Sequence, residues 1–213
     1  LVVDGTPVVG AIPPIETGTH TVTAEFRKPY HMHASIGPSA ALARFENGKL
    51  YVRSHSQGPS VIRDALAMAL DMKPEDVAVE HAENAGCYGH NGADDAAMDA
   101  AMLARQVPGQ SVLLKWHRQD EHAFEPYSPA MVMRLTGSVS DHRITHWNAD
   151  VYSQTHSGRP FAQAGASNLI AAWHRSQPMT RPVPRPGMGN HSGIHRNADP
   201  YYTIPRRRIV KHL

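Results

Sequence analysis

The sequence predicts an α+β fold, in which mixed or antiparallel sheets pack against a few helices. Two observations predict this class. Several short segments alternate apolar and polar residues with the two-residue period of a β-strand, and turn residues separate them. Two longer segments place apolar residues three and four positions apart, which is the pattern of one buried helix face.

The first half of the chain predicts a hairpin, two helices and one strand between them. Residues 41–54 alternate around an Asn-Gly turn, which is typical of a β-hairpin. Residues 59–72 follow the helical period and begin with a proline, which suits a first helical turn. We expect a short strand at 77–81 and a second helix at about 94–105.

The second half predicts mostly β-structure and then an irregular segment. Residues 111–121 are typical of a buried strand, and residues 131–154 of another hairpin. A short helix is predicted at 167–174. Residues 175–208 are rich in Pro and Gly, which do not support regular structure, and the final run 206–213 is again strand-like.

Composition limits the function classes. The chain has 213 residues, of which 41% are hydrophobic and 19% charged, enough for one large domain or two small ones. The formal net charge is +2, and Lys and Arg are scattered apart from residues 206–208, so no basic face indicates nucleic-acid binding. The single cysteine, Cys87, excludes an internal disulfide and leaves the redox compartment open. No apolar run reaches the eighteen residues that a membrane span requires.

We divide the chain into three predicted parts. Residues 1–24 form a connecting segment, residues 25–176 an α+β region, and residues 177–213 a Pro/Gly-rich extended segment. The chain opens without an initiator Met and closes abruptly, so we expect a piece of a longer protein. The apolar side chains of the final segment would then be covered by the remainder of that protein; the alternative is that this segment folds back on its own domain.

Residues 86–97, GCYGHNGADDAA, form the first candidate site. Three glycines at three-residue spacing lie between a predicted strand and a predicted helix, where backbone N–H groups can hold an anion. The spacing matches neither the dinucleotide fingerprint nor a P-loop. Asp94 and Asp95 already complement the dipole of the helix start. A ligand-contacting loop and a plain strand-to-helix turn both remain open.

The histidines and the cysteine raise the question of a metal site or a nucleophile. His31 and His33 would share one side of a strand, and His81, Cys87 and His90 could add further ligands. However, fifteen histidines make close pairs common by chance, and no complete zinc-ligand spacing is present. Cys87 has no third group assigned to orient it as a nucleophile. The sequence therefore favours neither a protein-ligated metal nor a cysteine enzyme.

The stretch SHSQGPS, residues 54–60, is the second candidate site. Gln57 follows a predicted strand and precedes a Gly-Pro break and a helix, so its amide can project into a pocket. There it could donate one hydrogen bond and accept another. The alternative is that Gln57 only caps the turn.

Five stretches together carry a family resemblance: FRKPYHMHASIGPSAALARF, SHSQGPSVIRDALAMALDMKPEDVAVE, GCYGHNGADDAAMDAAMLAR, VLLKWHRQDEHAFEPYSPA and RNADPYYTIPRRRIVKH. In this order they resemble the molybdopterin-binding large subunit of the xanthine dehydrogenase and aldehyde oxidase family, in the bacterial branch that includes isoquinoline 1-oxidoreductase. The resemblance extends from about residue 25 to the end of the chain. It implies that the α+β region is part of the molybdenum-cofactor-binding domain of a larger subunit.

The resemblance implies a molybdenum-dependent oxidoreductase that binds molybdopterin, in the cytosine dinucleotide form, with the metal held by the cofactor and not by protein ligands. Gln57 matches the catalytic glutamine whose amide hydrogen-bonds to a molybdenum oxo group. The implied cofactor-binding residues are Gln57, Gly86, Cys87, Tyr88, Gly89 and His90. The catalytic base glutamate of the family has no candidate in this chain, which alone should be incomplete as an enzyme.

The implied substrate pocket includes Phe124 and Tyr127. Tyr127 stands where purine-oxidising members carry an arginine, and Gly92 or a neighbour stands where they carry a glutamate. The resemblance therefore implies an aldehyde or an N-heteroaromatic substrate, oxidised with water as the oxygen source, in place of a purine.

The resemblance also implies partners. They are the remainder of the molybdenum-binding subunit, an iron–sulfur subunit that carries 2Fe-2S clusters, and a cytochrome c or flavin subunit. The chain cannot hold such clusters with one cysteine. The location stays open between periplasm and cytoplasm, and the resemblance favours the periplasm. The alternative function is a non-catalytic structural or interaction module of a multisubunit complex.

Overall fold

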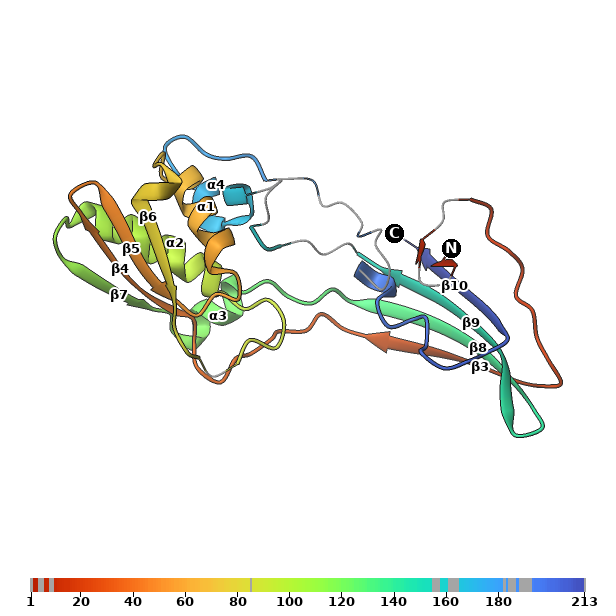
Figure 1. Cartoon of the computed structure of the whole chain (residues 1–213). Helices are drawn as coiled ribbons and strands as arrows, with labels where there is room; N and C mark the ends of the chain where they lie inside the picture. The colour runs from red at the N-terminus through yellow and green to blue at the C-terminus, as the bar shows by residue number, and fades with distance from the viewer. Residues whose placement is uncertain are drawn as a thin grey trace. The chain divides into compact units, whose positions relative to one another are not determined.

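The computed structural model describes residues 2–3, 6–7, 10–84, 86–154, 158–160, 165–181, 183, 187 and 193–212. The chain forms two compact units (Figure 1). The first unit combines Leu1–His31, Ser128–Ser157 and Pro184–Leu213, and the second combines Met32–Tyr127 and Gly158–Val183. Each unit is therefore built from segments that lie far apart in the sequence.

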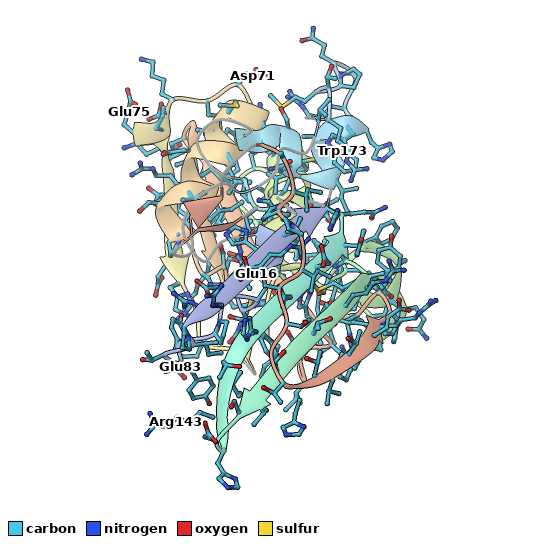
Figure 2. The ribbon with its side chains drawn as sticks, turned by 90° about the vertical axis from the view of Figure 1, so that its right-hand side faces the viewer. Glu16, Asp71, Glu75, Glu83, Arg143 and Trp173 are labelled. Atoms are coloured by element: carbon cyan, nitrogen blue, oxygen red, sulfur yellow. The ribbon has the colours of Figure 1, made fainter. Side chains whose placement is uncertain are left out.

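The first unit contains a six-stranded sheet with the order β2-β1-β10-β9-β8-β3. Its strands are β1 (Val2–Val3), β2 (Thr6–Pro7), β3 (His20–Lys28), β8 (Met131–Ser140), β9 (Arg143–Ser153) and β10 (Arg206–His212). Only the pair β9–β10 is parallel among the described strands of this sheet. Figure 2 shows the long strands side by side, with Arg143 beside the turn that joins β8 to β9. A small core forms around Ala149 and Ile209, and the short turn η3 (Gly193–His195) packs nearby.

The second unit contains a four-stranded sheet with the order β6-β5-β4-β7. Its strands are β4 (Ala40–Glu46), β5 (Lys49–Ser54), β6 (Val77–His81) and β7 (Ser111–Lys115), and β5–β6 is the parallel pair. Its helices and helical turns are α1 (Pro59–Ala69), η1 (Pro74–Asp76), α2 (Ala93–Gln106), α3 (Arg118–Phe124), η2 (Gly165–Asn168) and α4 (Ile170–Trp173). The main core lies between one face of this sheet and α1 and α2.

The residue pattern explains this core. In β5, Leu50 and Val52 are buried while their neighbours are exposed, as the two-residue period of a strand with one covered face requires. In α1, Ile62 and Leu66 are fully buried on the face that turns to the sheet. In α2, small alanine side chains dominate the buried face, which lets the helix lie close to the strands.

The fold class is α+β with mixed sheets, as predicted. Both predicted hairpins, both predicted long helices and the strand at 77–81 are confirmed. The short helix predicted at 167–174 is present as the turn η2 followed by α4.

Two local predictions are wrong. The strand predicted at 111–121 ends at Lys115, because His117 and Asp120 form a capping box that starts the helix α3. The strand predicted to hold His31 and His33 ends at Lys28, since a proline follows and cannot donate to the ladder. His31 instead forms an isolated bridge with Ser128, and His33 lies outside any strand.

The division at residues 24 and 176 stays a prediction. Part of the predicted extended segment 177–213, namely residues 182, 184–186, 188–192 and 213, lies outside the described residues. None of the helices that the structure describes is both long enough and apolar enough to cross a bilayer.

Candidate functional site

Gln57 lies in the connection between β5 and α1 of the second unit, and its side chain is exposed. Serine side chains hold this connection: Ser54 Oγ accepts from the Ser56 N–H at 3.2 Å, and Ser56 Oγ accepts from the Gly58 N–H at 3.2 Å. The start of α1 carries no side-chain cap among the described residues. The amide oxygen of Gln57 accepts a hydrogen bond from Arg159 Nη2 at 2.7 Å.

The loop Gly86–His90 joins β6 to α2 in an unusual backbone conformation. Gly86, Tyr88 and Gly89 all have positive φ, at +98°, +51° and +132°. Cys87 is buried, and its thiol donates to the carbonyl oxygen of Gly89 at 2.8 Å. Tyr88 is 62% exposed, and its ring covers Gly86, where an added Cβ would come within 2.5 Å of Tyr88 Cζ. Because Gly86 and Gly89 have no Cβ, neighbouring rings can lie close to their backbone, which other residues at these positions would prevent.

Gly89 supports the ring of His33. A Cβ built on Gly89 would collide with Cδ2 of His33, so no side chain fits there. His33 Nδ1 lies 3.2 Å from Glu125 Oε1, and Glu125 also accepts from the backbone N–H groups of His33 and Ala34. Burial, with the charge of nearby His90, lowers the pKa of His33, so the ring is neutral near pH 7.

We expect Gly89→Ala to loosen this loop. The substitution places a methyl group against His33 and also strains a positive φ, which costs about 1–2 kcal/mol by itself. The matched control is Gly48→Ala, because Gly48 has φ +77° but open space around its Cβ position. Hydrogen exchange of peptides that cover residues 86–92 should rise in Gly89→Ala beyond the change that Gly48→Ala causes at its own turn. Equal changes in the two variants would show that the contact with His33 is unimportant.

Arg159 joins the two candidate stretches. Its Nη2 donates to Gln57 Oε1 at 2.7 Å and to the Gly89 carbonyl oxygen at 2.7 Å, and it lies 3.5 Å from Cys87 Sγ. Its Nη1 lies 3.6 Å from Asp94 Oδ2. One guanidinium therefore brings together the Gln57 turn, the glycine loop and the first turn of α2.

Asp94 supplies the negative charge of this cluster. It is 2% exposed, accepts from Ser56 Oγ at 2.5 Å, and lies 3.3 Å from His90 Nε2. Burial opposes its ionisation, but the contacts with His90 and Ser56 and the charge of Arg159 outweigh burial and lower the pKa of Asp94. The carboxylate is therefore ionised at neutral pH and balances the arginine.

A hollow of about 250 Å³ opens beside this cluster. It is lined by Ser56, Gln57, Gly58, Val61, Asp94, Arg159 and Pro160. The polar side chains that line it include the amide of Gln57, the carboxylate of Asp94 and the guanidinium of Arg159. Such a hollow suits a ligand with oxygen acceptors.

Phe124 and Tyr127 lie at a different place in the same unit. Phe124 is half-exposed at the end of α3, with its ring centroid 6.2 Å from that of Trp116. Tyr127 is 42% exposed, and its hydroxyl donates to the His122 carbonyl oxygen at 2.9 Å. Neither is among the described residues that line the hollow beside Gln57. The structure thus brings Gln57 and the glycine loop together, and it leaves these two aromatic side chains outside that cluster.

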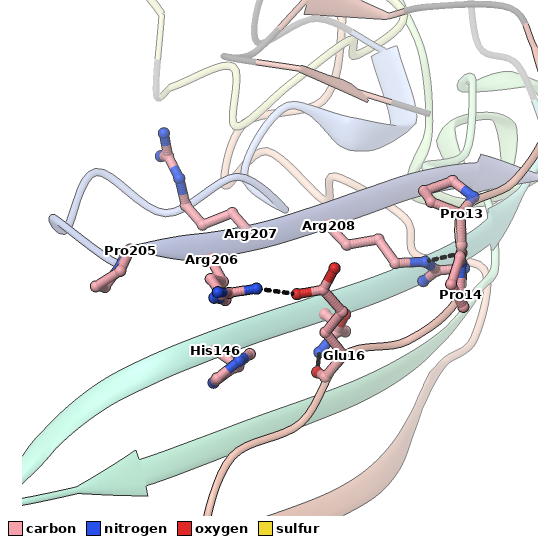
Figure 3. Close-up of a pocket in the computed structure, with 9 residues that line it drawn as sticks. Pro13, Pro14, Glu16, His146, Pro205, Arg206, Arg207 and Arg208 are labelled. Atoms are coloured by element: carbon pink, nitrogen blue, oxygen red, sulfur yellow. Dashed lines mark hydrogen bonds and ion pairs between the residues drawn. The ribbon is translucent and has the colours of Figure 1, made fainter.

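The first unit has a hollow of its own, of about 340 Å³, shown in Figure 3. Three consecutive arginines line it, and each has an acidic partner. Arg206 pairs with Glu16 at 2.6 Å, Arg207 with Asp199 at 3.0 Å and Arg208 with Asp150 at 2.8 Å. Because these charges are already balanced, the hollow offers no obvious anion site.

Within the described part of the chain, no three His, Cys, Asp or Glu side chains gather closely enough to hold a metal ion. His81, one of the ligands considered from the sequence, has its Nδ1 3.1 Å from the Ser56 carbonyl oxygen.

The profile of the molybdopterin cofactor-binding domain family matches residues 12–174 of this chain. The chain therefore belongs to the molybdopterin cofactor-binding domain family.

The chain is also similar to a curated protein and to solved structures. The chain is 37% identical over 126 residues to a subunit of nicotinate dehydrogenase from Pseudomonas putida, a match that covers 59% of this chain and 10% of that protein. Quinoline 2-oxidoreductase from Pseudomonas putida 86 shares the fold with a TM-score of 0.54 and 16% identity, over 63% of this chain and 18% of that one. A Cu,Mo-containing CO dehydrogenase gives a TM-score of 0.50 and 16% identity, over 62% of this chain and 17% of that one. This chain thus spans about a tenth of the length of the curated relative it matches.

Sequence reasoning missed Arg159 as a site residue. It lies in a short Gly-Arg-Pro stretch within an irregular segment, 102 positions after Gln57. The one available signal was an arginine held between a glycine and a proline, the residues that fix a special backbone path. Sequence reasoning also missed His33 and Glu125 as supports of the loop, because each depends on contacts across the fold.

Proposed function

We propose that this chain is part of a molybdenum hydroxylase, and that the cluster around Gln57 holds the molybdopterin cofactor. The single observation that carries the proposal is the convergence of Gln57 and the loop Gly86–His90 on Arg159, where Gln57 and Arg159 line one hollow. They belong to two of the five stretches that carried the family resemblance, and nothing local in the sequence requires them to meet.

The residues present fit such a cofactor. Gly86 and Gly89 allow the positive φ of the loop, and the rings of Tyr88 and His33 occupy the space beside them. The amide NH2 of Gln57 can donate to an oxygen atom in the hollow. In the proposed arrangement Gln57 and the loop residues Gly86, Cys87, Tyr88, Gly89 and His90 hold the cofactor. When bound, it supplies the two-electron redox chemistry that no side chain of this chain provides. We propose the cytosine dinucleotide form of the cofactor.

The roles of this chain's own residues follow from their contacts. The Gln57 amide orients an oxygen acceptor in the hollow by hydrogen bonding. Cys87 is a small buried neighbour whose thiol stays bonded inside the loop. Phe124 and Tyr127 are proposed as part of the substrate pocket, where exposed aromatic rings can stack on a flat substrate. The base glutamate lies outside this chain.

For the whole protein we propose the oxidation of an N-heteroaromatic substrate, with water as the source of oxygen. The relative named as a subunit of nicotinate dehydrogenase favours this class over an aldehyde. The proposed partners are the remainder of the molybdenum subunit, an iron–sulfur subunit with 2Fe-2S clusters, and a cytochrome c or flavin subunit.

Metal analysis of the intact protein tests the proposal. The protein that contains this chain should be purified with its partner chains, its molybdenum measured, and the co-purifying chains identified by mass spectrometry. We expect molybdenum in stoichiometric amount and activity toward nicotinate or a related N-heteroaromatic compound. A protein that carries no molybdenum when expressed in a cofactor-producing host would favour the alternative, a structural or interaction module.

Gln57→Ala should lower turnover without loss of the cofactor. Loss of one hydrogen bond to a polarised group costs about 1.5–3 kcal/mol, or roughly ten- to a hundredfold in rate if the bond acts in the transition state. The matched control is Gln106→Ala, which removes an exposed glutamine at the end of α2, away from the hollow. Steady-state kinetics and molybdenum content are measured together. Normal turnover at normal molybdenum content would contradict the role given to Gln57.

A further inference from the structure

The orientation of the Gln57 amide is fixed by its neighbour. An arginine side chain has only donors, so the atom of Gln57 that faces Arg159 must be the amide oxygen. The contact of 2.7 Å between Arg159 Nη2 and Gln57 Oε1 has this polarity. The opposite orientation would place two N–H groups against each other. The amide NH2 of Gln57 is therefore the end left to meet a ligand.

Arg159 is itself held in place. Its Nη2 donates to Gln57 Oε1 and to the Gly89 carbonyl oxygen, and it also lies 3.5 Å from Cys87 Sγ. Its backbone carbonyl accepts from Asn168 Nδ2 at 2.8 Å, and its guanidinium faces the buried carboxylate of Asp94. The side chain is only 20% exposed, so water competes weakly for these donors.

The contacts close a ring. Ser56 Oγ donates to Asp94, Asp94 faces Arg159, Arg159 donates to Gln57, and Gln57 follows Ser56 in the chain. A group that is fixed through a ring of contacts keeps its direction when a ligand binds, which is how a preorganised donor works.

We infer that Arg159 is the positioning residue of Gln57. By binding the amide oxygen of Gln57, it turns the amide NH2 toward the hollow as a hydrogen-bond donor, and it holds this amide in line with the Gly89 backbone. Arg159 acts through Gln57 and not by its own contact with the reacting groups. This inference rests on the proposed function, because it assigns a partner to the glutamine of that site.

A double-mutant cycle in the intact enzyme tests the inference. The variants are Gln57→Ala, Arg159→Gln and the double variant, with Arg159→Lys as the conservative change. The matched control is Arg175→Gln, because Arg175 lies in the same unit, is 17% exposed and pairs with Asp71 at 2.8 Å, outside the site.

We expect Arg159→Gln to lower kcat about tenfold, while KM stays within about twofold and the molybdenum content is unchanged. The reason is that the substitution weakens an interaction in the transition state and leaves the binding of substrate and cofactor unchanged. The double variant should match Gln57→Ala within about twofold, because a residue that acts only through Gln57 has no effect once Gln57 is gone. Arg159→Lys should recover part of the rate, since one ammonium donor can still reach Gln57 Oε1. Arg175→Gln should leave kinetics unchanged.

Two readouts do not depend on turnover. The electron paramagnetic resonance signal of the reduced molybdenum should shift alike in Arg159→Gln and in Gln57→Ala, and not in Arg175→Gln. In cofactor-free protein, hydrogen exchange of peptides over residues 86–92 should rise in Arg159→Gln, because the Gly89 carbonyl loses its donor.

Each contrary result has a distinct meaning. A double variant whose loss is the product of the two single losses would overturn the inference, because Arg159 would then act independently. Loss of molybdenum in both Arg159→Gln and Arg159→Lys would overturn it too, by showing a role in cofactor retention. An effect of Gln57→Ala with none of Arg159→Gln would refute this inference alone. No effect of Gln57→Ala would refute the role given to Gln57 in the proposed function, and the inference with it.

Discussion

Asp95→Asn is expected to stabilise the second unit by about 4 kcal/mol above neutral pH and to change little near pH 4. Asp95 lies in the first turn of α2, is 3% exposed, and accepts from the Ile170 N–H at 2.8 Å. Burial raises the pKa of Asp95 from 3.8 to about 7, and the neighbouring carboxylates Asp94 and Asp99 add to the rise. The folded protein thus prefers the neutral acid.

The sign of the pH dependence follows from this shift. Between the unfolded pKa of 3.8 and the folded value of about 7, the folded state binds more protons than the unfolded state. Stability therefore falls as pH rises through this window, and the full loss is present above it. Asparagine keeps an oxygen that can accept from Ile170 and does not ionise, so it escapes this loss.

Hydrogen exchange in α2, followed from about pH 4 to about pH 8, measures the difference in protection between Asp95→Asn and the parent protein. Asp64→Asn is the control, because it removes an exposed carboxylate on α1 of the same unit. A stability difference that stays constant across this pH range would show that Asp95 ionises like an ordinary carboxyl.

Glu125→Ala is expected to release the segment that enters β4. Glu125 is 3% exposed and accepts from the N–H groups of His33 and Ala34, while the fully buried Glu121 accepts from the Ser39 N–H. Two N–H groups would lose their acceptor, and each such loss costs about 1–3 kcal/mol. Because His33 packs on Gly89, the glycine loop should loosen as well.

Glu125→Gln separates the hydrogen bonds from the charge. Burial raises the pKa of Glu125 to about 7; the hydrogen bond from the His33 N–H opposes this rise, and the hydrogen bond with Glu121 adds to it. The fold therefore favours the neutral carboxylic acid, which an amide resembles. We expect Glu125→Gln to be much milder than Glu125→Ala when hydrogen exchange is measured over residues 31–40 and 86–92. Glu80→Ala, at an exposed glutamate of β6, is the control. Equal losses in Gln and Ala variants would contradict the acceptor role.

Much of the fold could be predicted from the sequence, because the signals are local. The Asn-Gly turn before Lys49 dictates one hairpin, and the spacing of apolar residues in α1 and α2 dictates two helices. The helix α3 was missed because it is seven residues long, too short for a period to distinguish it from a strand, and its start depends on a histidine cap.

The site could be predicted in part, because some of its signals are also local in the sequence. Gln57 and the glycines of residues 86–89 stand out as residue types with a special backbone or a free amide, so the sequence by itself identified both stretches. It left open whether each was a ligand contact or an ordinary turn. Only the fold shows that the two stretches share a partner.

The sequence by itself therefore determined the α+β class, the hairpins, the two long helices and the two stretches of the candidate site. Only the tertiary structure decided that β3 pairs with β8 in one unit while residues 32–127 and 158–183 form another, and that Arg159 meets Gln57 across 102 positions. The physical reason is the separation along the chain over which each interaction acts. Turn chemistry and periodicity act between neighbours, whereas strand partners, buried carboxylates and the reach of one guanidinium depend on which distant surfaces pack together.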